Sequence, residues 1–280
     1  MTQLPEWVLT GYSLNPWVLT ALFGPLLLYS IGVTRLWRQA GIGKGISRTQ
    51  SAAFTLGIIT LGVALLSPLE YVATMLFSAH MLQHMLLAFV AAPLLAWSEA
   101  GLAFLWAVPA RQRVTLSRRW LASGPLRQVV AWLTAPFSVL VLFTVTFWLW
   151  HAPLMYEAAL RSELIHALEH FMMFGAALLL WWLILQPSGR RRLPHGAAIL
   201  FVLATMLQGM VLASLLAFAV EPLYDAYVLS AQALGISALQ DQQLAGMIMR
   251  TPATLILLAT AVWLFLTWLG KLERRDLEYG

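Results

Sequence analysis

The stretch SAHMLQHMLLAFVAAPLL, residues 78–95, has the composition of a helix inside a lipid bilayer, yet it contains His80 and His84. A helix needs about 20 mainly apolar residues to cross about 30 Å of hydrocarbon. Ionisable side chains within such a span are costly, and they usually face the bundle interior or a wet cavity. The stretch therefore predicts both a membrane helix bundle and a polar site inside it.

The rest of the chain extends this pattern. It has 280 residues, of which 60% are hydrophobic and 10% are charged. Soluble domains carry about 25% charged residues, so this composition predicts an integral membrane protein. We expect an all-α polytopic bundle that forms a single domain over residues 1–280, with seven transmembrane helices. The seven apolar segments cover residues 16–34, 51–68, 76–96, 132–150, 165–186, 196–219 and 244–269.

Basic residues gather in alternate connections between these segments. Of the 17 Lys and Arg residues, only Arg161 and Arg250 lie elsewhere. The positive-inside rule therefore predicts cytoplasmic loops at 35–50, 99–131 and 187–195, an extracytoplasmic N-terminus and a cytoplasmic C-terminus. The mixture of Arg with Val, Leu and Trp in residues 99–131 suits either a short helix on the inner leaflet or a plain basic loop. Topology thus explains the basic excess, and no nucleic-acid partner is expected.

Five of the six histidines lie at one depth in this topology. His80 and His84 begin the third segment, His166 and His170 begin the fifth, and His151 ends the fourth. Residues four apart share one face of a helix, so each HxxxH pair presents two imidazoles in the same direction. The two pairs can face each other while His151 approaches from a third helix. Two such pairs at matched depth predict a metal or haem site.

Other residues at similar depth could support this site. Glu169 and Asp241 could accept hydrogen bonds from the imidazole N–H groups and so orient the ligands. We expect Arg250, about 13 Å of helix rise beyond Asp241, to need an acidic partner such as Glu169. Methionine thioethers could supply soft ligands, although methionine also fills gaps in helical cores. The candidate methionines are Met81, Met173, Met210 and Met247.

The available ligand types restrict the chemistry. The chain contains no cysteine, which excludes thiolate sites and disulfides. Imidazoles and thioethers suit copper as Cu(I) or Cu(II), and imidazoles on facing helices also suit bis-histidine haem. The HExxH signature of zinc proteases, the nucleophile elbow and the P-loop are absent, so we do not expect an enzyme. A copper permease would need polar groups continuing to the inner side, and the segments offer almost none there.

Five motifs occur in order between residues 70 and 258. They are HMLQHMLL…PLL, WHAPLMYEAAL, HALEHFMMF…LLLWW, PLYDAY and DQQLAGMIMRTP. In this set the chain resembles the bacterial CtaG family, membrane proteins for the assembly of caa-type cytochrome c oxidase. The resemblance implies a seven-span protein of the bacterial inner membrane that matures the oxidase by supplying copper to its copper B centre. The residues matched to the motifs are His80, His84, His151, His166, His170 and Asp241.

The same resemblance implies the partners. The client is the catalytic subunit of cytochrome c oxidase, which would receive copper laterally within the membrane. A site near the outer leaflet could exchange with extracytoplasmic copper, and an adjustable ligand set would favour transfer over storage. Membrane lipid is a further expected partner, and the chain could also form a homo-oligomer. Haem binding through the two HxxxH pairs and copper permeation remain the alternatives.

Overall fold

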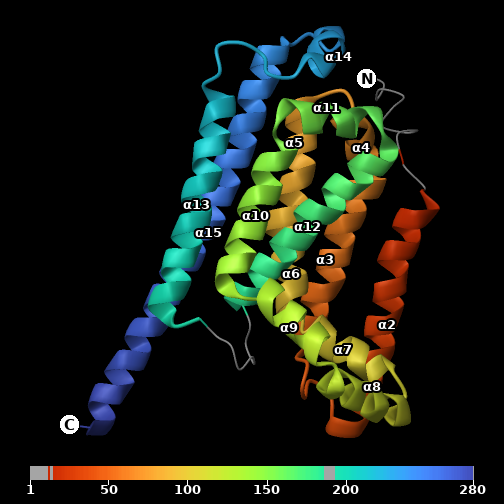
Figure 1. Cartoon of the computed structure of the whole chain (residues 1–280), viewed down its shortest axis with the longest axis vertical. Coiled ribbons are helices and arrows are strands. Elements are labelled where there is room, and N and C mark those ends of the chain that lie inside the picture. The colour runs from red at the N-terminus through yellow and green to blue at the C-terminus, as the bar shows by residue number, and fades with distance from the viewer. Residues whose placement is uncertain (1–11, 13–14, 186–192, 280) are drawn as a thin grey trace, which may run out of the picture.

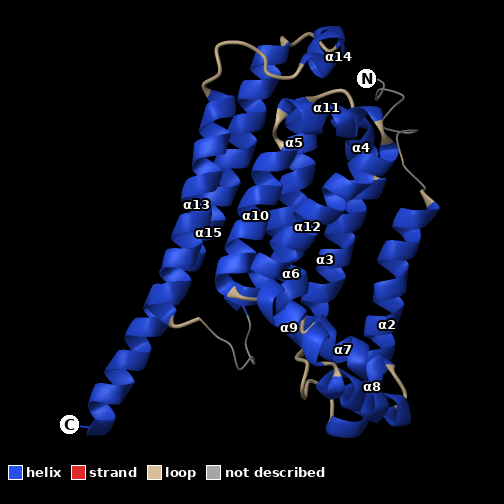
Figure 2. Cartoon of the chain, in the orientation of Figure 1, coloured by secondary structure: helices blue, strands red, loops and turns tan. Residues whose placement is uncertain are grey.

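The computed structural model describes residues 12, 15–185 and 193–279, and this part of the chain contains helices and no strand (Figure 2). The all-α prediction is therefore confirmed. Six spans are long and apolar enough to cross a membrane. Five are unbroken: α2 (Pro16–Ala40), α3 (Arg48–Leu66), α12 (Glu163–Leu185), α13 (His195–Ala217) and α15 (Ala238–Tyr279). The sixth, Phe77–Trp97, consists of α5 (Phe77–Leu86), the π-helical turn η1 (Leu87–Ala91) and α6 (Ala92–Trp97).

The fourth expected span differs from the prediction of one helix over 132–150. The helix α10 (Pro136–Trp150) has 15 residues and is about 22 Å long, which is short of the hydrocarbon thickness. The preceding helix α9 (Gly124–Leu133) meets it at a bend of 62°. Pro136 causes the break, because proline lacks an N–H donor and disfavours helical geometry in the residue before it. A count of seven spans requires this bent pair to act as one.

Residues 99–131 fold as helices, so the alternative of a plain basic loop is wrong. They form α7 (Ala100–Ala107), α8 (Ala110–Ala122) and most of α9. Glu99 adopts a left-handed conformation with φ of 55°, which separates α7 from α6. Pro109 separates α7 from α8 and serves as the N-cap of α8. Four arginines lie on α8: Arg111, Arg113, Arg118 and Arg119.

The bundle has two chemically different ends. Figure 1 shows the short helices α4, α11 and α14 at one end, which we call the histidine end, and α7 with α8 at the other, which we call the basic end. The short elements of the histidine end are α4 (Pro68–Ala73), α11 (Pro153–Arg161), the 3-10 turn η2 (Asp225–Tyr227) and α14 (Val228–Ala233). Part of the predicted loop 187–195, including its three arginines, lies outside the described residues. The sidedness of the two termini stays a prediction.

Close backbone approaches hold the outer helices. Figure 1 shows α13 and α15 along one side of the bundle and α2 along the other. At Gly246 on α15, an added Cβ would lie 2.5 Å from the Ala217 backbone nitrogen of α13. At Gly32 on α2, it would lie 1.8 Å from the Ala103 carbonyl oxygen of α7. Both positions require glycine, and small residues at membrane helix contacts allow this tight packing.

Candidate metal centre

The two HxxxH pairs lie on neighbouring helices, α5 and α12, and their imidazoles come together. The ring centroids are 4.4 Å apart for His80 and His84, and 4.3 Å apart for His166 and His170. Between the helices, His80 lies 5.4 Å from His166, and His84 lies 5.3 Å from His170. The structure therefore brings all four histidines of the predicted pairs into one cluster inside the bundle. Its role in binding metal stays a prediction.

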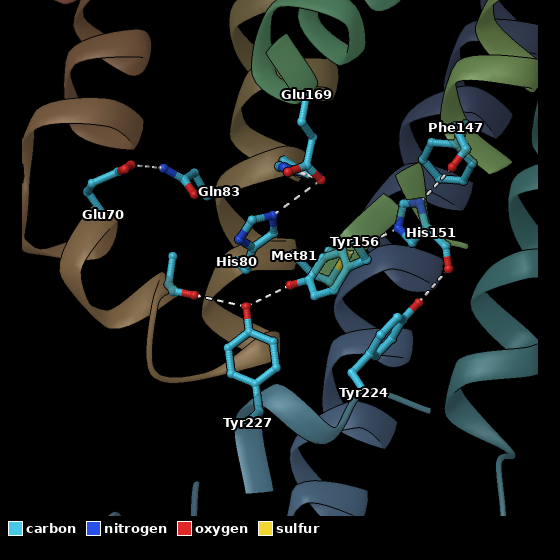
Figure 3. A network of polar contacts seen from close by, with 12 residues as sticks. Glu70, His80, Met81, Gln83, Phe147, His151, Tyr156, Glu169, Tyr224 and Tyr227 are labelled. Atoms are coloured by element: carbon cyan, nitrogen blue, oxygen red, sulfur yellow. Dashed lines mark hydrogen bonds and ion pairs between the residues drawn. The ribbon is translucent and has the colours of Figure 1, made fainter. Parts of the chain in front are cut away.

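Glu169 of α12 belongs to this cluster. Its Oε1 atom lies 3.6 Å from His80 Nε2 and 3.8 Å from His84 Nε2, and the residue is fully buried. Figure 3 shows the carboxylate pointing toward His80. These separations are longer than hydrogen bonds, so Glu169 does not support an imidazole in the expected way. It instead offers a carboxylate oxygen as a further candidate metal ligand beside the ring nitrogens.

The ligand atoms form two overlapping groups of three. His80, His84 and His170 make one group, and His80, His166 and Glu169 make the other. Within each group the candidate ligand atoms lie within 4.8 Å of one another. The two groups share His80. A cation could therefore occupy either position and keep this imidazole as a common ligand.

Many polar atoms of the cluster have no hydrogen-bond partner. They are His80 Nε2, both ring nitrogens of His84, His166 Nε2, His170 Nε2 and both carboxylate oxygens of Glu169. Leaving one buried polar atom unpaired costs about 1–3 kcal/mol, and more for a charged group. Native structures keep few such atoms, and a bound ion is one way to satisfy them. The donor set and its lack of partners fit a bound metal ion.

His151 lies beside the cluster and contacts it through Met81. Its Nδ1 atom is 2.7 Å from the Phe147 carbonyl oxygen. Because a carbonyl can only accept, Nδ1 carries the proton and Nε2 carries a lone pair. That Nε2 atom lies 3.4 Å from Met81 Sδ, and both side chains are buried (Figure 3). Two soft acceptors thus face each other with no proton between them, although His151 belongs to neither group of three.

Three tyrosines lie between the cluster and the histidine end of the bundle, and the sequence analysis did not predict them. The Tyr156 ring lies 5.3 Å from the His80 ring, and its hydroxyl is 2.7 Å from that of Tyr227. Tyr227 donates to the Ala73 carbonyl oxygen (3.2 Å), and Tyr224 donates to that of His151 (2.8 Å). Burial raises the pKa of all three phenols well above its usual value, so they stay neutral donors. The only signal in the sequence was their place in WHAPLMYEAAL and PLYDAY.

We expected Asp241 to accept hydrogen bonds from the histidines, but its partners lie elsewhere. Its carboxylate accepts from the backbone N–H groups of Phe77 (2.6 Å) and Ser78 (3.2 Å), at the start of α5. Leu76, the N-cap residue of α5, provides no side-chain hydrogen bond. A carboxylate from α15 therefore satisfies these free N–H groups and the positive end of the helix dipole. It fixes the start of α5 three residues before His80.

Glu70 and Gln83 form a second anchor that the sequence did not reveal. Gln83, between the two histidines of α5, donates from Nε2 to the Ala64 carbonyl oxygen (2.8 Å) and to the Glu70 carboxylate. Burial raises the pKa of the Glu70 carboxyl, while the hydrogen bond from Gln83 opposes this change. These bonds tie α5 to the end of α3 and to α4, so the first pair of histidines has little freedom to rotate.

Arg250 and two of the four candidate methionines, Met210 and Met247, lie away from the cluster. The expected ion pair between Arg250 and Glu169 does not form in the described structure. The Arg250 guanidinium lies 5.9 Å from the Phe218 ring centre and lines a small cavity with Met210. Met173 is buried in the hydrophobic core, and Met247 is 53% exposed. Glu169 lies between α5 and α12. The Arg250 guanidinium instead lies beside Phe218 at the end of α13, so the two side chains do not meet.

A protein-family model described as cytochrome c oxidase caa3 assembly factor (Caa3_CtaG) matches residues 27–271, which include the whole of the site. No curated protein and no solved structure matches the chain significantly.

Proposed function

Because the chain belongs to the family of cytochrome c oxidase caa3 assembly factors, we propose that its buried cluster binds copper and delivers it to the copper B centre of the oxidase. The ion is cargo in this function, and the protein is not an enzyme. The observation that carries the proposal is the convergence of four imidazoles and one carboxylate whose inward atoms have no hydrogen-bond partner. A cation at this point would satisfy these atoms together.

The two overlapping groups suit transfer. An ion that moves from the group with His84 and His170 to the group with His166 and Glu169 keeps His80 bound throughout. Each step then exchanges only part of the ligand set. Imidazole nitrogens accept both oxidation states of copper, and the chain lacks the thiolates that would hold the ion too tightly. The cluster can therefore bind copper and still release it.

His151 and Met81 form a softer pair next to this cluster. A ring nitrogen with a free lone pair and a thioether sulfur are ligands that Cu(I) prefers. Their position beside His80 and beneath the tyrosines suits the first contact with Cu(I) arriving from the histidine end. The cluster with its carboxylate would then receive the ion from this pair.

The alternatives fit the site less well. A haem group would have to fit between imidazoles that are already 4.3–6.0 Å apart and packed against Tyr156. A copper permease would need polar groups continuing toward the basic end. The buried residues that follow His84 on the same span are apolar: Met85, Leu87, Ala88, Phe89, Ala91, Ala92 and Leu95.

The charge pattern supports one orientation in the membrane. The basic end, with the arginines of α2 and α8, belongs in the cytoplasm by the positive-inside rule. The histidine end then faces the extracytoplasmic side of the bacterial inner membrane. From this depth copper can pass laterally to the catalytic subunit of the oxidase, which lies in the same membrane.

The test combines metal content and oxidase maturation. We expect the double variant His84→Ala/His170→Ala to insert normally, to lose copper binding, and to yield an oxidase that contains haem but little copper B. His195→Ala at the basic end is the matched control and should behave as wild type. Copper is measured in the purified protein and in oxidase from a deletion strain complemented with each variant. Full copper loading of the double variant would refute the proposal, and a Soret band lost with these histidines would favour haem.

A further inference from the structure

A hollow at the basic end gathers three arginines, and it is unrelated to the copper site. It lies between the C-terminal turns of α2 and the connection from α7 to α8, and its volume is about 270 Å³. Its lining includes Arg35, Arg38, Gln39, Pro109, Ala110 and Arg113. Two of the arginines come from α2 and one from α8. Three positive charges thus converge on one small space from two helices.

No carboxylate compensates these charges among the described residues. None of the three guanidinium groups takes part in an ion pair there. Arg35 donates to the Ala107 carbonyl oxygen, which holds its side chain against the end of α7. The Arg113 guanidinium lies 4.1 Å from the Trp106 ring centre, and its Nε atom is buried without a hydrogen-bond partner. Two of the three arginines are thus held in place, and the described part of the chain supplies no counter-charge.

The start of α8 adds to the positive potential. This helix has 13 residues and begins at Ala110, which lines the hollow. Its N-cap residue, Pro109, provides no side-chain hydrogen bond. The backbone N–H groups of Gln112 and Arg113 bond to the Pro109 carbonyl oxygen, which leaves those of Ala110 and Arg111 for a ligand. Free N–H groups at a helix start, together with arginines, form the usual setting for a phosphate group.

We propose that this hollow binds the phosphate of an anionic phospholipid headgroup. Arginine side chains bind phosphate through paired hydrogen bonds, and three of them can surround one phosphodiester. The source is a lipid because the hollow lies at the end of α2, a helix that meets the length and hydropathy requirements of a membrane span. Leu105 and Val114, on the two helices that border it, are 41% and 53% exposed, and acyl chains can cover such side chains. The bound lipid would fasten α8 to the end of α2.

The test counts bound lipids on the purified full-length protein. Phosphatidylglycerol is titrated into the protein in a neutral detergent, and individual bound lipids are resolved by native mass spectrometry. We expect one tightly held lipid on the wild type. Replacing Arg35, Arg38 and Arg113 with Gln should lower the affinity for this lipid by about fivefold per arginine, or about 100-fold together. The double variant Arg38→Gln/Arg113→Gln keeps the Arg35 bond to α7 and guards against a failure to fold; about a 25-fold loss is expected there.

The control removes the same charge outside the hollow. Arg111, Arg118 and Arg119 also lie on α8 but do not line the hollow. Their replacement with Gln should leave the tight lipid within about threefold of wild type. If both triple variants lost lipid affinity equally, general surface charge would explain the binding, and the proposal would be overturned. So would an unchanged lipid count in the hollow variants, or displacement of the lipid by inorganic phosphate at equal concentration.

Discussion

Replacing Glu169 with Gln should change copper affinity and protein stability in opposite directions. The substitution keeps the size of the side chain and removes its negative charge. Glu169 Oε1 lies 3.6 and 3.8 Å from the Nε2 atoms of His80 and His84, so we place a cation held between these groups about 4 Å from the carboxylate. Two unit charges 4 Å apart attract by about 4 kcal/mol at an effective dielectric constant of about 20. Copper affinity should therefore fall about 1000-fold.

The copper-free protein should respond with the opposite sign. Both carboxylate oxygens of Glu169 are buried without hydrogen-bond partners, which disfavours the folded state in the absence of an ion. A neutral amide reduces this penalty, and we expect the free energy of unfolding to rise by about 1–3 kcal/mol. Thermal unfolding in detergent with and without copper measures both effects, and competition with a Cu(I) chelator gives the affinity.

A matched control uses the same substitution outside the cluster. Glu157 on α11 pairs with the exposed Arg161 at 2.8 Å. Its replacement with Gln should leave copper affinity unchanged and alter stability by less than about 1 kcal/mol. If Glu169→Gln bound copper within about threefold of wild type, the carboxylate would not be near the ion and the two overlapping groups would be wrong. A less stable copper-free variant would contradict the argument from unpaired oxygens.

Three further results follow from the same geometry. Asp241→Ala should lower copper affinity by about 10- to 100-fold by releasing the start of α5, and a chelator competition that gave wild-type affinity would contradict this. Met81→Leu, which conserves volume, should remove sulfur from the X-ray absorption spectrum of the Cu(I)-loaded protein while Met85→Leu does not; a sulfur signal that persisted without Met81 would exclude it as a ligand. Cysteines at Gln112 and Gln232 should react with an impermeant reagent from opposite sides of the membrane, and labelling of both from one side would refute the topology.

The sequence predicted the four clustered histidines because two independent regularities coincide in it. The spacing of four places each pair on one helix face, and the positions within two apolar segments place both pairs at one depth. Neither regularity depends on how the helices pack. The alignment of the two faces does depend on packing, and the structure supplies it through the neighbouring positions of α5 and α12.

The roles of the two acidic residues could not be predicted in the same way. Asp241 accepts a hydrogen bond from the backbone N–H of Phe77, which lies 164 residues away in the sequence. No local sequence pattern predicts such a contact. Glu169 follows His166 by three residues and therefore shares its helix face, a relation that the sequence contains. Its placement between the imidazoles of α5 depends on the distance between two helices. Sequence periodicity gives directions around a helix, whereas this distance is set by tertiary packing.

The prediction of membrane helices from apolar length has a related limit. Apolar length predicted the six helices that are long and apolar enough to span a membrane, because such a helix must satisfy its backbone internally over a fixed thickness. Residues 132–150 have the same apolar length, yet one proline shortens the helix and bends the chain by 62°. Composition averaged over a window does not register a single residue that removes a hydrogen-bond donor. The mixture of arginines with apolar residues in 99–131 left a short helix and a plain loop both open, and the structure has helices α7 and α8 and most of α9 there.

The anchoring of α5 indicates which ligands would move during the copper release that we propose. Asp241 holds the start of this helix, Gln83 ties its middle to α3 and α4, and Trp181 donates to the Ala88 carbonyl oxygen in the π-helical turn that follows it (2.8 Å). Turns of this kind are frequent at functional sites. His80 and His84 are therefore fixed on a helix held at three points. Under the proposed copper-binding function, exchange of ligands would then occur through the side chains of α12 and through His151, with His80 as the constant ligand.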